Sequence, residues 1–98
     1  MAMYELERDV ERHLVNEVKR LGGYCLKWVS PGVRGVPDRI VLLSGGRIAF
    51  AELKRHDGEL AAWQRKWLAI LARLGFTVGV LRSRADVNRF LGDVTNGI

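Results

Sequence analysis

The alternation of apolar and polar positions along the chain predicts three helices and four strands. From Tyr4 to Leu21 apolar side chains recur with a helical period, and Gly22-Gly23 then closes the segment. The apolar half of this predicted amphipathic helix holds Leu6, Val10, Leu14, Val15, Val18 and Leu21. Glu7 and Glu11 also project from that half. The helix macrodipole is a sufficient reason for an acid at the helix start, as at Glu7, but a weaker one for Glu11.

Two apolar runs flank a Ser44-Gly45-Gly46 turn and predict a β-hairpin. If the turn is centred on Gly45, Asp38 and Glu52 each lie seven residues from it and stand opposite each other. Lys54 lies on the same face as Glu52, because strand side chains alternate. Two carboxylates and one ammonium therefore meet at the open end of the hairpin. Charge beside an apolar sheet costs free energy unless the charges pair or bind a metal.

The remaining apolar segments complete an α/β chain. They predict a strand at Tyr24–Val29, a helix at Glu59–Leu74, a strand at Phe76–Leu81 and a short helix that begins at Ser83. Both faces of the hairpin are apolar, so helices must cover both sides of the sheet. We expect Trp63 and Trp67, in the apolar stripe of the second helix, to be core residues rather than base-stacking platforms.

Length and composition indicate a single domain spanning residues 1–98, with frayed ends at 1–3 and 93–98. No apolar run approaches the roughly 20 residues that cross a bilayer, and the charged start lacks a signal-peptide core. We therefore expect no membrane partner and an intracellular, cytoplasmic location. The single cysteine, Cys25, excludes an internal disulfide and is expected in the core. With only His13 and His56 beside it, a Cys/His zinc site is improbable.

The net charge of +5 and a pI near 10.0 favour a polyanionic partner such as DNA. The alternative is a basic surface without a partner. Arg34, in a glycine-rich loop, and Arg55, in a polar turn, are candidate phosphate contacts. His56, in the same turn, is expected to be exposed rather than catalytic.

Pro37-Asp38, followed by Glu52-Leu53-Lys54 on the next strand, resembles the PD-(D/E)XK signature of metal-dependent nucleases. The wider string from Gly35 to Arg39 is similar to the VRR-NUC branch, known from stand-alone phage proteins and from the nuclease domain of the Fanconi-associated nuclease. The resemblance extends from about Glu7 to Leu91. It implies a restriction-endonuclease-like αβββαβ(α) core, in which helices flank a mixed sheet, and a phage-encoded protein that acts in the host cell.

The activity that this resemblance implies is Mg²⁺- or Mn²⁺-dependent hydrolysis of DNA phosphodiester bonds by an endonuclease. Oxygen ligands suit these ions, and we expect Asp38, Glu52 and the Leu53 carbonyl to bind the metal. Lys54 would activate the attacking water and steady the developing negative charge.

Two further polar positions match the family pattern. The resemblance assigns a first-helix glutamate to the metal, which we place at Glu11, through water or a second ion, with Glu7 as the alternative. Gln64 lies inside an apolar stripe, where a buried amide needs partners. The resemblance also places a glutamine there, so we assign Gln64 to the site.

The sequence is also compatible with other functions. The same residues fit a non-catalytic nucleic-acid-binding module with a surface ion-pair cluster, or a restriction- or repair-type nuclease that acts on other DNA structures. A domain this small has little surface for reading sequence, which favours branched DNA such as Holliday junctions or flaps. Stand-alone VRR-NUC proteins look like dimers, so the resemblance implies a homodimer that presents two sites.

Overall fold

A mixed four-stranded sheet forms the centre of the molecule in a computed structural model that describes residues 4–96. The strands lie in the order β1 (Tyr24–Lys27), β2 (Arg39–Leu43), β3 (Arg47–Leu53) and β4 (Thr77–Leu81). The first three strands are antiparallel, whereas β4 runs parallel to β3. This confirms the predicted mixed sheet.

The β2–β3 hairpin has the register that its glycine turn predicts. Ile40 pairs with Phe50 and Arg39 pairs with Ala51, so the next residues along, Asp38 and Glu52, face each other beyond the last pair. Gly45 has a φ of +83°, a backbone conformation that residues with a Cβ rarely adopt. The turn therefore fixes which residues meet at the far end of the hairpin.

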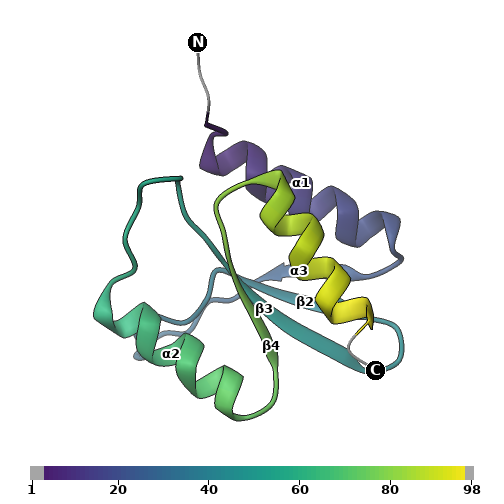
Figure 1. Ribbon diagram of the computed structural model, residues 1–98. Coiled ribbons are helices and arrows are strands. Elements are labelled where there is room, and N and C mark those ends of the chain that lie inside the picture. The colour runs from purple at the N-terminus through teal and green to yellow at the C-terminus, as the bar shows by residue number, and fades with distance from the viewer. Residues whose placement is uncertain (1–3, 97–98) are drawn as a thin grey trace.

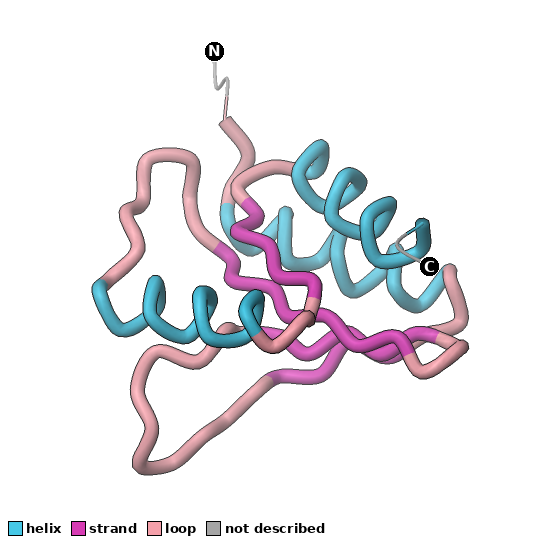
Figure 2. Tube along the Cα trace, turned by 60° about the horizontal axis from the view of Figure 1, so that its bottom comes forward, coloured by secondary structure: helices cyan, strands magenta, loops and turns pink. Residues whose placement is uncertain are grey.

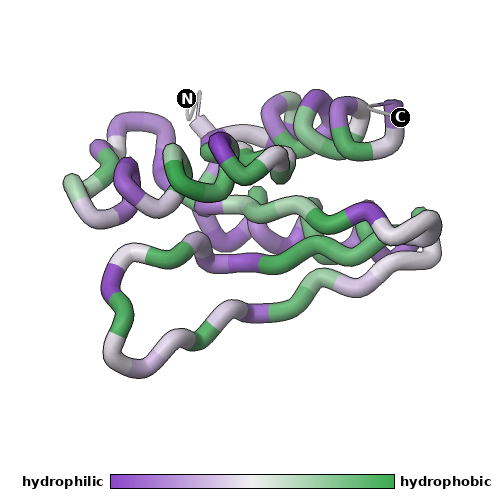
Figure 3. Tube along the Cα trace, turned by 90° about the horizontal axis from the view of Figure 1, so that it is seen from below, coloured by the Kyte–Doolittle hydropathy of each residue, from purple (hydrophilic) through white to green (hydrophobic). Residues whose placement is uncertain are grey.

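Within the described residues, three helices cover the two faces of this sheet (Figures 1 and 2). Helices α1 (Glu7–Arg20) and α3 (Arg84–Asn96) lie side by side on one face, and α2 (Ala62–Arg73) lies on the other. In Figure 3 the strands are mainly hydrophobic along their length, whereas the helices alternate between hydrophobic and hydrophilic positions. The element order αβββαβα confirms the predicted fold class.

The main core lies between the sheet and the α1–α3 pair. Val10, Leu14 and Val18 of α1 have no exposed surface and pack in one cluster with side chains of β2, β3, β4 and α3. Burying a side chain of this size contributes about 1.5–3 kcal/mol. Cys25 packs partly buried against the same cluster, as expected.

The second face carries a smaller aromatic cluster under α2. The Trp28 ring lies 5.2 Å from Phe50 and 6.5 Å from Trp67, measured between ring centroids. Trp67 is therefore packed as predicted, but the same prediction is wrong for Trp63, which is 45% exposed. Trp63 lies in the first turn of α2, where its backbone lies close to Gly35 in the loop before β2.

The ends of several elements differ from the predictions. Helix α1 begins at Glu7 rather than Tyr4, and α2 begins at Ala62 rather than Glu59. The predicted fraying of 93–98 is wrong as far as Asn96, because α3 continues to that residue and buries Val94. Residues 1–3 and 97–98, also expected to fray, lie outside the described residues. No helix in the described range is long and apolar enough to span a membrane.

Candidate active site

Asp38 is fixed at the open end of the hairpin by both neighbouring strands. Its Oδ2 accepts a hydrogen bond of 2.8 Å from the Leu53 amide of β3. Its backbone oxygen accepts one of 3.0 Å from the Trp28 amide, just after β1. The buried Pro37 precedes it and restricts the chain where it enters β2. The Asp38 carboxylate is thus held beside β3 although the residue is exposed.

Glu52 is the only buried polar or charged residue within residues 4–96, with 2% of its surface exposed. Its Oε2 accepts a hydrogen bond of 2.9 Å from Gln64 Nε2, whereas its buried Oε1 has no partner. Burial, and after it the nearby Asp38 carboxylate, raise the pKa of Glu52 from 4.5 to about 7, whereas Lys54 acts in the opposite direction. A buried carboxylate with an unpartnered oxygen and a second carboxylate beside it suits a cation.

Gln64 connects this carboxylate to the start of α2. Its Oε1 accepts a hydrogen bond of 2.9 Å from the Ala61 amide at the N-cap, and its Nε2 donates to Glu52. Both ends of the amide are therefore used, which fixes its orientation. Because Gln64 donates to the ionised form of Glu52, it favours the charged carboxylate.

Glu11 and Glu7 of α1 border the other side of the site. With Asp38, Leu53 and residues 27–29 they line a cavity of about 280 Å³. Glu11 is already held there, because its Oε2 accepts a hydrogen bond of 2.9 Å from Arg39 Nε.

Arg39 is the residue of this site that the sequence analysis missed. Its side chain is 13% exposed and also donates through Nη1 to the Cys25 carbonyl, at 3.1 Å. A signal was present in the sequence, since Arg39 is the only charge in the otherwise apolar β2 and directly follows Asp38. Alternation places it on the face that α1 covers.

The structure gathers the predicted site residues in two groups. Asp38, Glu52 and Gln64 form one, and Lys54, half-buried, is near enough to influence Glu52. Glu11 lies in the other group, with its carboxylate engaged by Arg39, and Asp38 borders both groups because it lines one cavity with Glu11. In the described part of the chain, no three Asp, Glu, His or Cys side chains are close enough together to hold a metal ion. Asp38 and Glu52 nevertheless provide the oxygen donors that Mg²⁺ and Mn²⁺ prefer.

The remaining candidates lie on the surface. Arg34 is exposed, with its guanidinium carbon 5.7 Å from the centre of the Trp63 ring. Arg55 is exposed and forms an ion pair of 3.1 Å with Asp57. His56 is exposed, as expected, and its ring stacks on Tyr4 with 3.6 Å between ring centroids.

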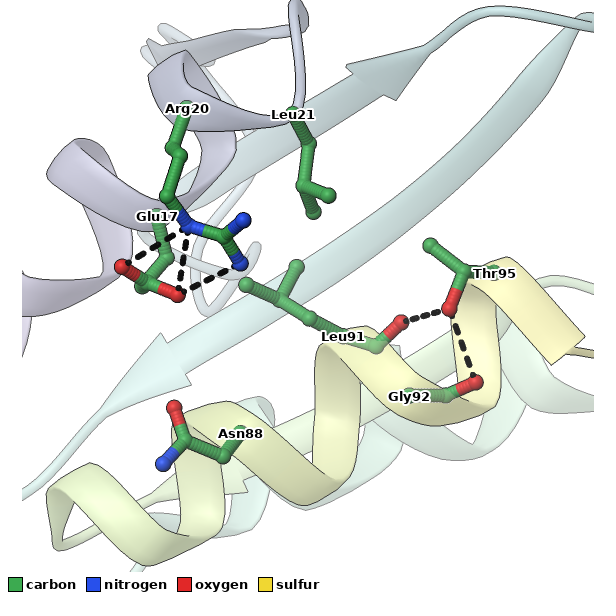
Figure 4. Close-up of a pocket in the computed structure, with 7 residues that line it drawn as sticks. All are labelled: Glu17, Arg20, Leu21, Asn88, Leu91, Gly92 and Thr95. Atoms are coloured by element: carbon green, nitrogen blue, oxygen red, sulfur yellow. Dashed lines mark hydrogen bonds and ion pairs between the residues drawn. The ribbon is translucent and has the colours of Figure 1, made fainter.

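A separate cavity of about 270 Å³ opens between the end of α1 and α3 (Figure 4). It contains none of the candidate residues. Its polar side chains have partners, since Arg20 Nη2 lies 3.0 Å from Glu17 Oε1, the Thr95 hydroxyl donates to the Leu91 carbonyl at 2.9 Å, and Asn88 Oδ1 lies 2.9 Å from His13 Nε2. The candidate active site is therefore the hairpin end and not this cavity.

Known proteins are similar to this chain in both fold and sequence. A solved structure described as a VRR-NUC domain superposes with a TM-score of 0.81 and 26% identity, covering 88% of this chain and 94% of that one. A protein of Acyrthosiphon pisum secondary endosymbiont phage 1, named "Putative nuclease p44", is 46% identical over 78 residues, which are 80% of this chain and 84% of the phage protein. The fold is therefore that of a VRR-NUC domain.

The sequence model of the VRR-NUC domain family matches residues 5–85, a range that contains every candidate site residue. The chain belongs to the VRR-NUC domain family. This confirms the resemblance inferred from the Pro37-Asp38 and Glu52-Leu53-Lys54 motifs, and it makes the chain a nuclease.

Proposed function

We propose that this nuclease is a metal-dependent endonuclease that hydrolyses DNA phosphodiester bonds at the open end of the β2–β3 hairpin. The observation that supports this most is the buried Glu52, with an unpartnered Oε1 and a raised pKa, beside Asp38. Such an arrangement costs stability in the protein alone and is relieved when a cation binds. A surface ion-pair cluster, as in a non-catalytic binding module, would not bury one of its charges.

Asp38 and Glu52 are the residues that would hold Mg²⁺ or Mn²⁺, together with the Leu53 carbonyl. Asp38 Oδ2 already accepts the Leu53 amide, which leaves its Oδ1 for the ion. When bound, the ion supplies Lewis acidity and lowers the pKa of water. Gln64 holds the Glu52 carboxylate in one orientation, and Lys54 steadies negative charge that develops on the phosphate and orients the attacking water.

Glu11 would contribute through a water molecule or a second ion. Arg39 engages only its Oε2, so Oε1 remains for this role. Glu7 is the alternative, but it is exposed, and within residues 4–96 no side chain fixes its carboxylate. Glu11→Gln should therefore lower cleavage more than Glu7→Gln while both variants fold, and equal losses would contradict this choice.

The substrate we propose is branched or flapped DNA inside a host cell, cut in DNA repair or phage DNA processing. The net charge of +5 and the exposed Arg34 and Arg55 support a DNA partner. A restriction- or repair-type nuclease that acts on other DNA structures is the competing enzyme. Activity compared on four-way junction, flap, single-stranded and duplex DNA separates these possibilities.

A homodimer would present two such sites to a branched substrate. Helix α2 covers only part of its face of the sheet. On the rest of that face large apolar side chains are exposed, at Tyr24, Leu26 and Ile48. Contiguous exposed apolar residues of this kind indicate an interface. Light scattering after gel filtration should give twice the monomer mass, and Leu26→Lys should give a folded monomer. A monomeric wild-type protein would contradict the dimer but not the nuclease.

The function is tested by incubating the protein with those four DNA structures in Mg²⁺, Mn²⁺ or EDTA. Asp38→Asn and Lys54→Ala should each lower the cleavage rate by on the order of 100-fold or more, because each removes a group that acts in the chemical step. Asp93→Asn is the matched control, since Asp93 is an exposed carboxylate on α3. DNA binding without cleavage in either metal, or cleavage unaffected by Asp38→Asn, would contradict the proposal.

A further inference from the structure

Trp63 lies on the surface close to two cations. Its side chain is 45% exposed, although tryptophan is among the side chains that gain most from burial. Arg34 Cζ lies 5.7 Å from the ring centroid, and Lys66 Nζ lies 5.1 Å from it. Within residues 4–96 neither cation forms an ion pair with an acidic side chain, so their charges are available to an anion from outside.

This cluster is rigidly connected to both halves of the candidate active site. Trp63 directly precedes Gln64, which hydrogen-bonds to Glu52. Gly35 has a φ of +85°, and a Cβ there would lie 2.5 Å from the Trp63 carbonyl carbon. The loop that carries Arg34 is thus packed tightly on the first turn of α2, and it reaches Asp38 four residues after Arg34.

We propose that Trp63, flanked by Arg34 and Lys66, is a stacking platform for an unpaired nucleotide of the substrate strand. The base would take the place of one cation on the ring, and both cations would then contact the flanking phosphates. Base–aromatic stacking with neighbouring cations is a general way to hold single-stranded nucleic acid. The bases of an intact duplex stack on each other and do not expose their faces to a protein ring.

This inference deepens the proposed function, on which it rests, because it names the part of the substrate that is recognised. DNA with an unpaired segment beside the scissile phosphate, such as a flap, would be preferred over a continuous duplex. The platform would position that segment next to Asp38 and Glu52, since both elements that carry it lead directly into the site.

The test measures binding of a labelled single-stranded oligothymidine and of a duplex of equal length by fluorescence anisotropy, in EDTA so that no cleavage occurs. Trp63→Ala should weaken single-strand binding on the order of 10-fold and leave duplex binding unchanged, while Trp63→Phe retains most of the affinity. Leu74→Ala is the matched control, because Leu74 is an exposed apolar residue at the other end of α2. An abasic oligonucleotide should bind the wild-type protein weakly. It should bind Trp63→Ala with the same weak affinity, because it has no base to stack on the ring.

The results separate this inference from the proposed function. Equal losses for single strand and duplex, an unchanged Trp63→Ala, or an equal effect of Leu74→Ala would overturn the platform. If Trp63→Ala does not fold, Trp63→Leu keeps the apolar bulk without the aromatic ring, and wild-type affinity in that variant would overturn it as well. Failure of the wild-type protein to cut any DNA with Mg²⁺ or Mn²⁺ contradicts the endonuclease, whereas the binding measured in EDTA still decides the role of Trp63.

Discussion

Replacing Glu52 with glutamine should stabilise the protein while abolishing its activity. The substitution keeps the shape of the side chain and an oxygen that can accept the hydrogen bond from Gln64. It removes the single buried charge of the described residues. Because a carboxylate that binds metal is needed for cleavage but unfavourable without metal, stability and activity should change in opposite directions.

The magnitude follows from the pKa of Glu52. A value of about 7 in the folded protein, against 4.5 ordinarily, corresponds to about 3 kcal/mol less favourable ionisation on folding. The folded pKa is the higher one, so between these two values the folded protein binds a proton that the unfolded chain has released. The contribution of Glu52 to stability is therefore fully present below about pH 4.5, decreases as the pH rises to about 7, and is constant above it.

Urea denaturation in EDTA at about pH 5 and about pH 8 measures this effect. The free energy of unfolding of Glu52→Gln should exceed that of the wild type by up to about 3 kcal/mol at the higher pH and by much less at the lower pH. Glu59→Gln, which removes an exposed carboxylate, is the matched control and should show no such difference. Mg²⁺ should stabilise the wild type, more so at the higher pH, and leave Glu52→Gln unaffected. A Glu52→Gln variant that is less stable than the wild type at the higher pH, or a difference independent of pH, would refute the reasoning.

Three further substitutions test the groups around the carboxylates. Arg39→Ala removes an ion pair and a hydrogen bond from a site that is mostly buried, and it should lower the free energy of unfolding by about 1–3 kcal/mol in urea titrations. Gly35→Ala should destabilise the protein more than Gly32→Ala. Both glycines have a positive φ, but only at Gly35 would the new Cβ meet the α2 backbone. Similar unfolding midpoints for the two variants would count against that contact. Gln64→Ala removes a donor to the buried carboxylate, so the rising limb of the pH–rate profile should move to higher pH, and an unmoved profile would argue against its positioning role.

The fold and the centre of the site follow from short-range patterns in the sequence. Alternation of apolar residues defines the strands, and the glycine turn fixes the hairpin register, so the meeting of Asp38 and Glu52 is predictable without a structure. Gln64 is predictable for a similar reason, because a polar amide inside an apolar stripe requires a partner.

What the sequence does not determine is how the helices lie across the sheet. The pairing of Glu11 with Arg39 depends on the placement of α1 over β2, which no local pattern specifies. The exposure of Trp63 depends on how α2 lies over the sheet, since a helical wheel identifies an apolar stripe but not which part of it is covered. The end of α3 is different, because Val94 continues the helical spacing of Val87, Phe90 and Leu91, so its extension to Asn96 was readable from the sequence.

The division of the molecule into two faces explains how it tolerates a buried charge. The fully buried aliphatic cluster lies between the sheet and α1 and α3, whereas Glu52 lies on the opposite face, where Gln64 of α2 reaches it. The free energy that Glu52 costs is therefore offset by a core on the other face of the sheet. Substitutions at Glu52 or Gln64 should change activity while the protein remains folded, whereas truncation of Leu14, in the main core, should cost about 2–5 kcal/mol and unfold a marginally stable domain.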